Sequence, residues 1–368
     1  SIPSNVISIG KMAFSSLNLS TIDIPSSVTE IKDSAFYDSS LKSIKIPEGV
    51  VSLGSYVFSN CTTLVSVDIP SSLLNIGVQI FKECHDLVDI NVASENPNYS
   101  SVDGVLYNKD KTELIFVPKG VESFTIPTSV IRIAEGAFEA CWNLTSITIP
   151  SSVTSIGDRA FSNCINLINV GLSSNLISIG NQAFADCGLL TDLKIPSSVT
   201  SIGNQAFADC RSLSVMKIPS SVTSIGERAF FNCYGLSEFQ VDADNQNFTT
   251  IDGVLFSKDL TKIIAVHGKL TEYEVPYGVT SIADYQFYRY PSTLKSVIIP
   301  PSVTRIGSDA FFGCNSLKSI YIPSSVVRFG NTAFLDCWNA RITIDNSVDN
   351  IVDEGGAFYE SGHVEWLR

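Results

Sequence analysis

The chain has 368 residues, of which 44% are hydrophobic and 17% charged, and this composition is too apolar for a disordered protein. A net charge of −13, from 24 basic against 37 acidic residues, disfavours nucleic acid and anionic membranes as partners. No stretch approaches the roughly 20 apolar residues of a membrane-spanning helix, and the first residues do not resemble a signal peptide. We therefore expect a soluble segment without membrane insertion and without a nucleic-acid partner.

The dominant feature of the sequence is a repeat of about 23 residues. Its most regular copies contain Ile-Pro-Ser-Ser-Val-Thr-Ser-Ile-Gly-x-x-Ala-Phe-x-x-Cys, and the decapeptide SIGNQAFADC occurs twice, at residues 178–187 and 201–210. Successive copies lie 22 to 24 residues apart, except for two intervals of 57 residues. The repeat phenylalanines are Phe14, Phe36, Phe58, Phe81, Phe138, Phe161, Phe184, Phe207, Phe230, Phe287, Phe311, Phe334 and Phe358.

Each copy combines two local patterns. A short run alternates apolar and small polar residues, as at Leu144, Ile147 and Ile149, which predicts a strand. The proline that follows, Pro150 in this copy, lacks an N–H group and ends the strand. The spacing of the Ala-Phe-x-x-Cys segment then places phenylalanine and cysteine on one side of a short helix or 3₁₀ turn.

A coil of about 23 residues cannot bury its own apolar residues, so neighbouring coils must stack. We predict an α/β, β-rich fold, in which residues 1–368 form a single right-handed solenoid. A parallel β-sheet covers one face, short helical or 3₁₀ turns cover the other, and the phenylalanines form a continuous buried column. The sequence begins with Ile2-Pro3, the last two positions of a repeat strand, and ends in an incomplete repeat after Phe358. Both ends therefore look truncated, and we expect a longer protein.

The two long intervals hold related insertions. The segment that starts at Asn96 corresponds to the one that starts at Asn245, at an offset of 149 residues. Each shows a strand, a polar turn and a second apolar run, which predicts β-hairpins at about 93–120 and 242–269 in place of the Ala-Phe unit. Both contain an Asp-Gly pair, which we interpret as a turn because no calcium-loop spacing accompanies it.

All nine cysteines lie three residues after a repeat phenylalanine. This regular placement has two interpretations: a framework of disulfides or metal sites, or a row of buried free thiols. In-register side chains keep Cβ atoms about 5 Å apart, farther than the 3.5–4.5 Å typical of a disulfide, so we favour buried thiols. The three histidines are isolated, and no metal-ligand spacing, catalytic motif or phosphate loop occurs. The sequence predicts no metal, no cofactor and no enzyme activity.

The string L-x-x-L-x-L-P-x-x-L-x-x-I-G-x-x-A-F-x-x-C, present from Leu190 to Cys210 with isoleucine and valine in place of some leucines, resembles the BspA-like (treponemal-type) leucine-rich repeat family. The resemblance covers essentially the whole chain. It implies a leucine-rich repeat solenoid in a bacterial or protist protein that is secreted or exposed on the cell surface. It also implies a link to adhesion to host proteins or to other cells.

The leading hypothesis for function is a monomeric binding module that holds a protein partner, such as a host extracellular or cell-surface protein. A spacer or display scaffold is the main alternative, and carbohydrate binding is a third. Between the inward positions of each strand, outward residues form a column that changes from basic to acidic to apolar near the second insertion. The predicted partner-binding residues are Lys194, Lys217, Glu238, Gln240, Glu272, Glu274, Ile298 and Tyr321.

Overall fold

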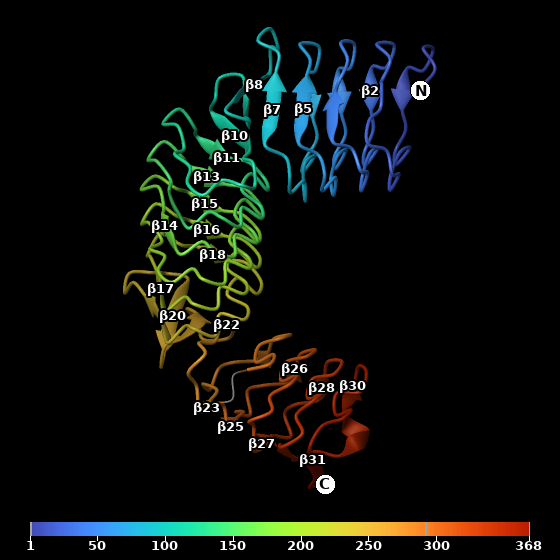
Figure 1. The fold of residues 1–368 in the computed structure, drawn as a ribbon. Coiled ribbons are helices and arrows are strands. Elements are labelled where there is room, and N and C mark those ends of the chain that lie inside the picture. The colour runs from blue at the N-terminus through green and yellow to red at the C-terminus, as the bar shows by residue number, and fades with distance from the viewer. Residues whose placement is uncertain (1, 291–292, 368) are drawn as a thin grey trace. The chain divides into compact units, whose positions relative to one another are not determined.

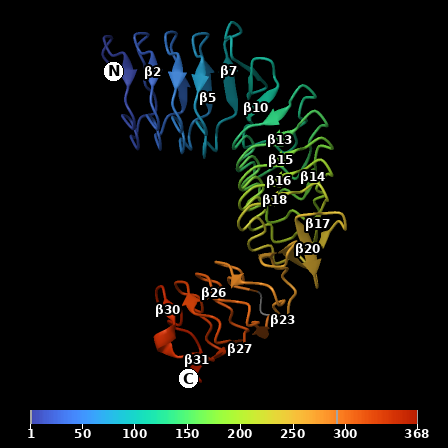
Figure 2. The same cartoon turned by 180° about the vertical axis from the view of Figure 1, so that it is seen from behind.

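The computed structural model describes residues 2–290 and 293–367, in which short strands of successive coils lie side by side (Figures 1 and 2). These residues divide into two compact units. The first runs to Leu190 and includes Ile202–Phe207, and the second contains Thr191–Ser201 and the chain from Ala208 onward.

In the first unit, the coils contribute strands to two kinds of parallel ladder. The longer strands pair in the order β3 (Ser43–Lys45), β5 (Ser66–Ile69) and β7 (Asp89–Val92), and farther along β12 (Ser146–Thr148) pairs with β14 (Asn169–Gly171). Two-residue strands form the other ladders: β1 (Ser8–Ile9), β2 (Glu30–Ile31), β4 (Ser52–Leu53) and β6 (Asn75–Ile76), then β11 (Arg132–Ile133), β13 (Ser155–Ile156) and β15 (Ser178–Ile179). Strand β16 (Ser201–Ile202) lies at the boundary between the units.

The second unit repeats this arrangement. Strand β17 (Val215–Ile218) pairs with β19 (Glu238–Val241), and a five-stranded parallel sheet contains β23 (Glu272–Glu274), β25 (Ser296–Ile298), β27 (Ser319–Ile322), β29 (Arg341–Ile344) and β31 (His363–Trp366). The short strands are β18 (Ser224–Ile225), followed by the ladder β24 (Ser281–Ile282), β26 (Arg305–Ile306), β28 (Arg328–Phe329) and β30 (Val352–Asp353). The short strands were not predicted from the sequence, because a segment of two residues is too short to show an alternation of apolar and polar residues.

Each insertion consists of three antiparallel strands. They are β8 (Tyr99–Val102), β9 (Val105–Asn108) and β10 (Glu113–Phe116) in the first unit, and β20 (Phe248–Ile251), β21 (Val254–Ser257) and β22 (Ile263–Ala265) in the second. The third strand returns the chain to the solenoid, since β10 pairs in parallel with β11 and Lys262 forms a parallel bridge with Ser281.

The helical face expected from the sequence is wrong, and with it the α part of the α/β class. The residues described contain one helix, the 3₁₀ helix η1 (Val348–Asn350), and no α-helix. The Ala-Phe segments are instead hydrogen-bonded turns.

Alternating hydrogen bonds explain why these turns do not become helices. The Ala160 N–H group donates within its own coil to the Gly157 carbonyl at 3.3 Å, whereas the Arg159 N–H group donates to Asn181 of the next coil at 2.8 Å. Arg159 and Asn163 also have positive φ angles of 54° and 62°, which interrupt a right-handed helix. Every second amide therefore stacks the coils, so too few amides remain for a helical ladder.

The repeat glycine is required by this close stacking. A Cβ atom on Gly180 would lie 2.5 Å from the carbonyl carbon of Gly157 in the neighbouring coil. No side chain fits at that distance, so the Ser-Ile-Gly part of the repeat is a consequence of backbone approach.

Phenylalanine rings form the centre of the core in separate stacks. In the first unit these are Phe14–Phe36–Phe58–Phe81 and Phe138–Phe161–Phe184–Phe207, and in the second Phe287–Phe311–Phe334–Phe358. Neighbouring rings lie 4.7 to 6.0 Å apart and within 11° of parallel. Eleven of the thirteen repeat phenylalanines are buried, while Phe14 and Phe358 are partly buried.

The insertions interrupt these stacks, so the expectation of one continuous column is corrected. In the first unit, Phe116 of the insertion meets Phe81 edge-on at 5.3 Å, and Phe124 meets Phe138 edge-on at 5.6 Å. In the second unit, Phe230 meets Phe239 edge-on at 5.1 Å. The rings next to the insertions therefore meet the repeat phenylalanines edge-on instead of stacking parallel to them.

Candidate functional site

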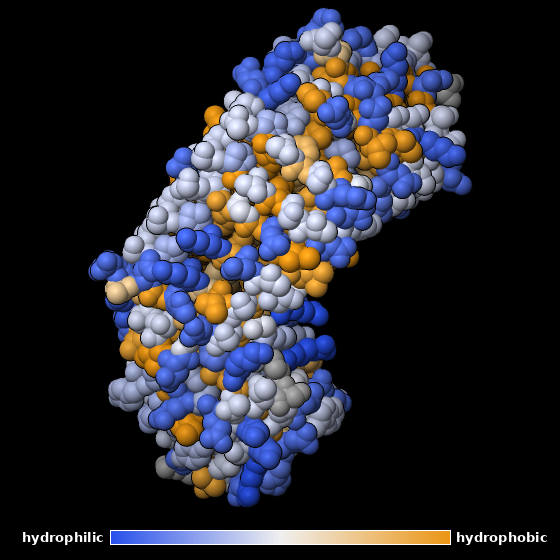
Figure 3. Space-filling view, turned by 60° about the vertical axis from the view of Figure 1, so that its left-hand side comes forward, coloured by the Kyte–Doolittle hydropathy of each residue, from blue (hydrophilic) through white to orange (hydrophobic). Residues whose placement is uncertain are grey.

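The predicted binding column lies on the outer side of the longer strands, and all eight of its residues fall within the second unit. Each strand alternates buried and accessible residues, as in β23, where buried Tyr273 separates exposed Glu272 and Glu274. Period-two alternation in a half-buried strand produces this arrangement. On the side shown in Figure 3, apolar residues reach the surface in short patches between hydrophilic ones.

The basic part of the column is paired with nearby polar groups. Lys217 lies opposite Gln240 in the register of β17 and β19, and its ammonium group contacts the Asp242 carboxylate at 3.1 Å. The Gln240 amide donates to the Glu238 carboxylate at 2.6 Å. Lys194 is exposed in the preceding coil. Lys217 and Gln240 therefore each pair with an acidic side chain at the surface.

The second insertion separates Lys217 and Gln240 from the acidic residues Glu272 and Glu274 of the column. The Phe239 N–H group on β19 donates to the Gly253 carbonyl at 2.8 Å, so the turn between β20 and β21 lies beside β19. Gly253 has a φ of 73°, and a Cβ atom there would lie 2.9 Å from the Glu238 Cβ. Glu272 and Glu274 belong to a different sheet. The structure thus does not place all eight predicted residues on one continuous ladder.

The apolar part of the column is brought together. Ile298 on β25 lies directly opposite Tyr321 on β27, and Glu274 on β23 lies opposite Ile298. Ile298 is 55% exposed and Tyr321 is 44% exposed, and the Tyr321 hydroxyl donates to the Asp345 carboxylate at 3.0 Å. Two large side chains therefore form an accessible apolar pair with an acidic residue on the adjacent strand.

The cysteines have a role that sequence analysis missed. All nine are buried and free, which confirms their placement as unpaired thiols in the core. The Cys187 thiol donates to the Phe161 carbonyl of the preceding coil at 3.2 Å, and Cys337 does the same to Phe311 at 2.9 Å. Burial raises the pKa of Cys187 to about 12, so this thiol stays protonated and unreactive near neutral pH. The constant spacing of three residues between phenylalanine and cysteine was the sequence feature that could have indicated this hydrogen bond.

A comparison with known families decides what these coils are. The description "BspA type leucine-rich repeat region", with six copies, matches residues 1–102, 113–237, 178–274 and 266–365. The chain belongs to the BspA-type leucine-rich repeat family. The sequence resemblance to this family is thereby confirmed.

Solved structures resemble this BspA-type repeat chain. A leucine-rich cell surface protein from Faecalibacterium prausnitzii is 27% identical, with a TM-score of 0.59 over 89% of this chain and 88% of that protein. The pneumococcal vaccine antigen PcpA is 19% identical, with a TM-score of 0.48 over 100% of this chain and 78% of that one. A leucine-rich repeat protein from Eubacterium ventriosum is 22% identical, with a TM-score of 0.44, and the match covers 98% and 81% of the two chains. Among curated proteins, none matches.

The described residues of the BspA-type repeat chain form neither a metal site nor a membrane-spanning helix. Within residues 2–290 and 293–367, no three His, Cys, Asp or Glu side chains gather in a way that could hold a metal ion. The same residues contain no helix that is both long and apolar enough to span a membrane. A cavity of about 620 Å³ lies beside the second insertion, and one of about 220 Å³ lies beside the first.

Proposed function

We propose that this chain is a non-enzymatic bacterial repeat protein, secreted or exposed on the cell surface, that binds a protein partner in adhesion or host interaction. Family membership supports a repeat scaffold, and the F. prausnitzii structure it resembles at 27% identity is described as a cell surface protein. In this proposal the chain is a monomer that forms a single right-handed solenoid, and the partner binds the outer face of the strands in the second unit.

The apolar pair Ile298–Tyr321 carries the proposal. The two side chains are neighbours on β25 and β27 and are 55% and 44% exposed. Tyrosine is enriched among the residues that dominate binding energy at protein interfaces, especially where it sits at a dry centre within a polar rim. Glu272 and Glu274 on one side and the Arg341–Glu365 ion pair at 2.8 Å on the other supply charges that orient an approaching partner.

The test replaces both residues of the pair, Ile298→Ala and Tyr321→Ala, in the full chain. Binding to a panel of immobilised extracellular and cell-surface proteins is measured by surface plasmon resonance. Because hot-spot truncations cost about 2 kcal/mol or more, we expect affinity for the captured partner to fall by roughly 30-fold. The matched control is Trp338→Ala, which removes another large exposed side chain, 56% accessible, from a turn.

Equal affinity of the double variant and the wild-type chain would contradict the strand-face assignment, most clearly if Trp338→Ala abolished binding. A chain that binds no protein on the panel but still positions a fused domain would instead support the spacer alternative. Replacing Glu272 and Glu274 by lysine separately tests whether these acids orient the partner, since association should slow at low salt.

A further inference from the structure

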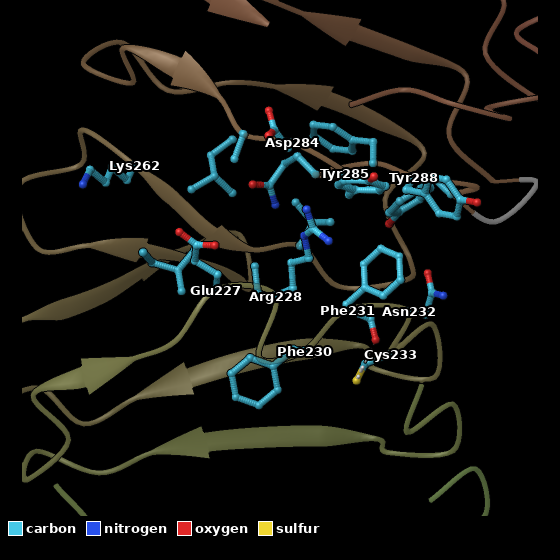
Figure 4. Close-up of a pocket in the computed structure, with 18 of the residues that line it drawn as sticks. Glu227, Arg228, Phe230, Phe231, Asn232, Cys233, Lys262, Asp284, Tyr285 and Tyr288 are labelled. Atoms are coloured by element: carbon cyan, nitrogen blue, oxygen red, sulfur yellow. Dashed lines mark hydrogen bonds between the residues drawn. The ribbon is translucent and has the colours of Figure 1, made fainter. Parts of the chain in front are cut away.

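The second insertion leaves a gap in the row of Ala-Phe turns. It supplies antiparallel strands but no Ala-Phe turn, so the turn at 226–232 faces the turn at 283–289 without a coil between them. The gap contains a cavity of about 620 Å³, shown in Figure 4, and its lining includes the apolar residues Ile263 and Ala265 of β22. Regular turns of the first unit stack directly, with Arg159 donating to Asn181 and Asn163 donating to Ala185.

Backbone hydrogen-bonding groups on both walls of this cavity are open. On one wall, the N–H groups of Arg228 and Asn232 have no acceptor in the described part of the chain. On the opposite wall, the carbonyls of Asp284 and Gln286 have no donor among the residues of known position. Donors on one side and acceptors on the other are the arrangement that a further stretch of polypeptide would complete, because an extended chain carries both groups.

The cavity also holds two cations without a carboxylate partner. The Arg228 guanidinium lies 3.9 Å from the centre of the Tyr285 ring, and neither it nor the Lys262 ammonium forms an ion pair among the described residues. Figure 4 shows Arg228 projecting toward Tyr285, whereas Lys262 lies on the other side of Glu227 in this view of the cavity. Arg305 differs, since it binds Asp284 at 3.3 Å. In a protein with a net charge of −13, two unpaired cations at one cavity favour an acidic ligand.

The first insertion shows that such a gap can be closed by the chain itself. There the Val117 N–H group donates to the Ala137 carbonyl at 2.9 Å, and the Lys119 ammonium donates to the Glu139 carbonyl at 2.6 Å. Lys82 also contacts the Glu139 carboxylate at 3.6 Å. The remaining cavity is about 220 Å³. At the second insertion, the Tyr234 hydroxyl donates to the Tyr288 carbonyl at 2.5 Å, and Phe231 packs against Tyr285 and Tyr288. Its described residues make no bonds equivalent to those of Val117 and Lys119, and the cavity is larger, about 620 Å³.

We propose that the cavity beside the second insertion binds an extended peptide segment that carries an aspartate or glutamate side chain. The peptide carbonyls accept from the Arg228 and Asn232 N–H groups, and its N–H groups donate to Asp284 and Gln286. Its carboxylate binds the Arg228 guanidinium, which lies 3.9 Å from the centre of the Tyr285 ring. This inference rests on the proposed function in one respect, namely that the partner is a polypeptide.

The test uses the full chain and three fluorescein-labelled, end-blocked pentapeptides, Val-Thr-Glu-Thr-Val and its central glutamine and lysine counterparts. Fluorescence anisotropy measures the dissociation constants. We expect the glutamate peptide to bind at least tenfold more tightly than the glutamine peptide, since hydrogen bonds to charged groups contribute about 1.5–3 kcal/mol. N-methylation of both threonine amides should weaken binding at least tenfold, because it removes backbone donors.

The matched variants are Arg228→Gln and Arg159→Gln. Both arginines precede Ala-Phe and have a φ of 54°, but Arg159 lies in a regular turn, where its side chain donates to Gln182 at 2.7 Å. Arg228→Gln should abolish the preference for glutamate, and Arg159→Gln should retain it. Thermal unfolding of both variants checks that the fold is intact.

The proposal is overturned if no peptide binds, if glutamate and glutamine peptides bind equally, or if N-methylation has no effect. Sodium glucuronate that displaces the glutamate peptide as well as the unlabelled peptide does would assign the cavity to carboxylated sugars instead. Binding of a whole partner protein to the variants distinguishes the strand face at Ile298 and Tyr321 from the cavity. Loss in the Ile298/Tyr321 double variant with retention in Arg228→Gln supports the strand face and not the cavity, and the reverse pattern supports the cavity alone.

Discussion

Asn96 and Asn245 lie 149 residues apart and anchor their insertions to the preceding coil through the same four hydrogen bonds. The Asn245 side-chain amide donates to the carbonyls of Pro219 at 2.7 Å and Val222 at 3.1 Å, and its oxygen accepts from the N–H groups two and three residues later at 2.8 Å. Asn96 makes the equivalent four bonds at 2.7 to 3.0 Å. Both residues are fully buried. A recurring insertion therefore requires asparagine at its start.

Replacement of Asn245 by alanine should destabilise the protein by about 3 kcal/mol or more, because buried donors and acceptors lose their partners and each such group costs about 1–3 kcal/mol. Urea unfolding monitored by fluorescence measures the change. Asn175→Ala is the control, since Asn175 is exposed and its side chain makes a single bond, to Ser151 at 2.9 Å. Equal losses in the two variants would contradict the anchoring role.

The aromatic stack predicts a position-dependent loss of stability. Phe184→Ala removes a buried ring that stacks on Phe161 at 5.1 Å and on Phe207 at 5.5 Å, and it should cost about 3–5 kcal/mol. Phe14→Ala should cost less, because Phe14 is only partly buried. Chemical denaturation compares the two variants. A larger loss from Phe14→Ala would show that stacking is not the main contribution.

Close approach of two regular coils predicts that Gly180 does not tolerate even one methyl group. Gly180→Ala places a Cβ atom 2.5 Å from the backbone of Gly157, and the coils must separate to relieve the contact. We expect a loss of about 1–3 kcal/mol or more, measured as a lower unfolding midpoint. Gly188→Ala serves as the control, since no atom lies within 4 Å of its added Cβ. Insensitivity of Gly180 would contradict the stacking distance.

The buried thiols predict a decrease of stability at alkaline pH. Burial raises the pKa of Cys187 from 9.0 to about 12, so an unfolded chain releases this proton at lower pH than the folded one. The stabilisation that the buried, protonated thiol contributes to the folded state is fully present below about pH 9 and is lost as the pH rises toward 12. Burial likewise raises the pKa of Cys141 to about 12.

Urea midpoints at pH 7 and pH 10 should therefore differ, with the lower value at pH 10. The decrease should be smaller in a variant with Cys141→Ala and Cys187→Ala, because two titrating groups are removed. Rapid labelling of the native cysteines by a thiol reagent at pH 8, without unfolding, would show that the thiols are accessible and would contradict this account.

Sequence alone determined the features that recur with every coil. The 23-residue period, the buried phenylalanines, the outward column and the free cysteines all follow from what one coil requires of its identical neighbours. Repetition shows each requirement in many copies, nine for the cysteine and thirteen for the phenylalanine, and Gly180 is conspicuous in the sequence because the same contact recurs along the chain.

Tertiary structure decided the features that depend on contacts between different coils. The turns at Arg159 resemble a helix in their spacing, but bonds to the next coil use every second amide and exclude one. The open walls at Arg228 and Gln286 arise because a coil is missing there, and the sequence records only an insertion. Local spacing specifies which residues face inward, whereas only the stacked structure shows which backbone groups find a partner.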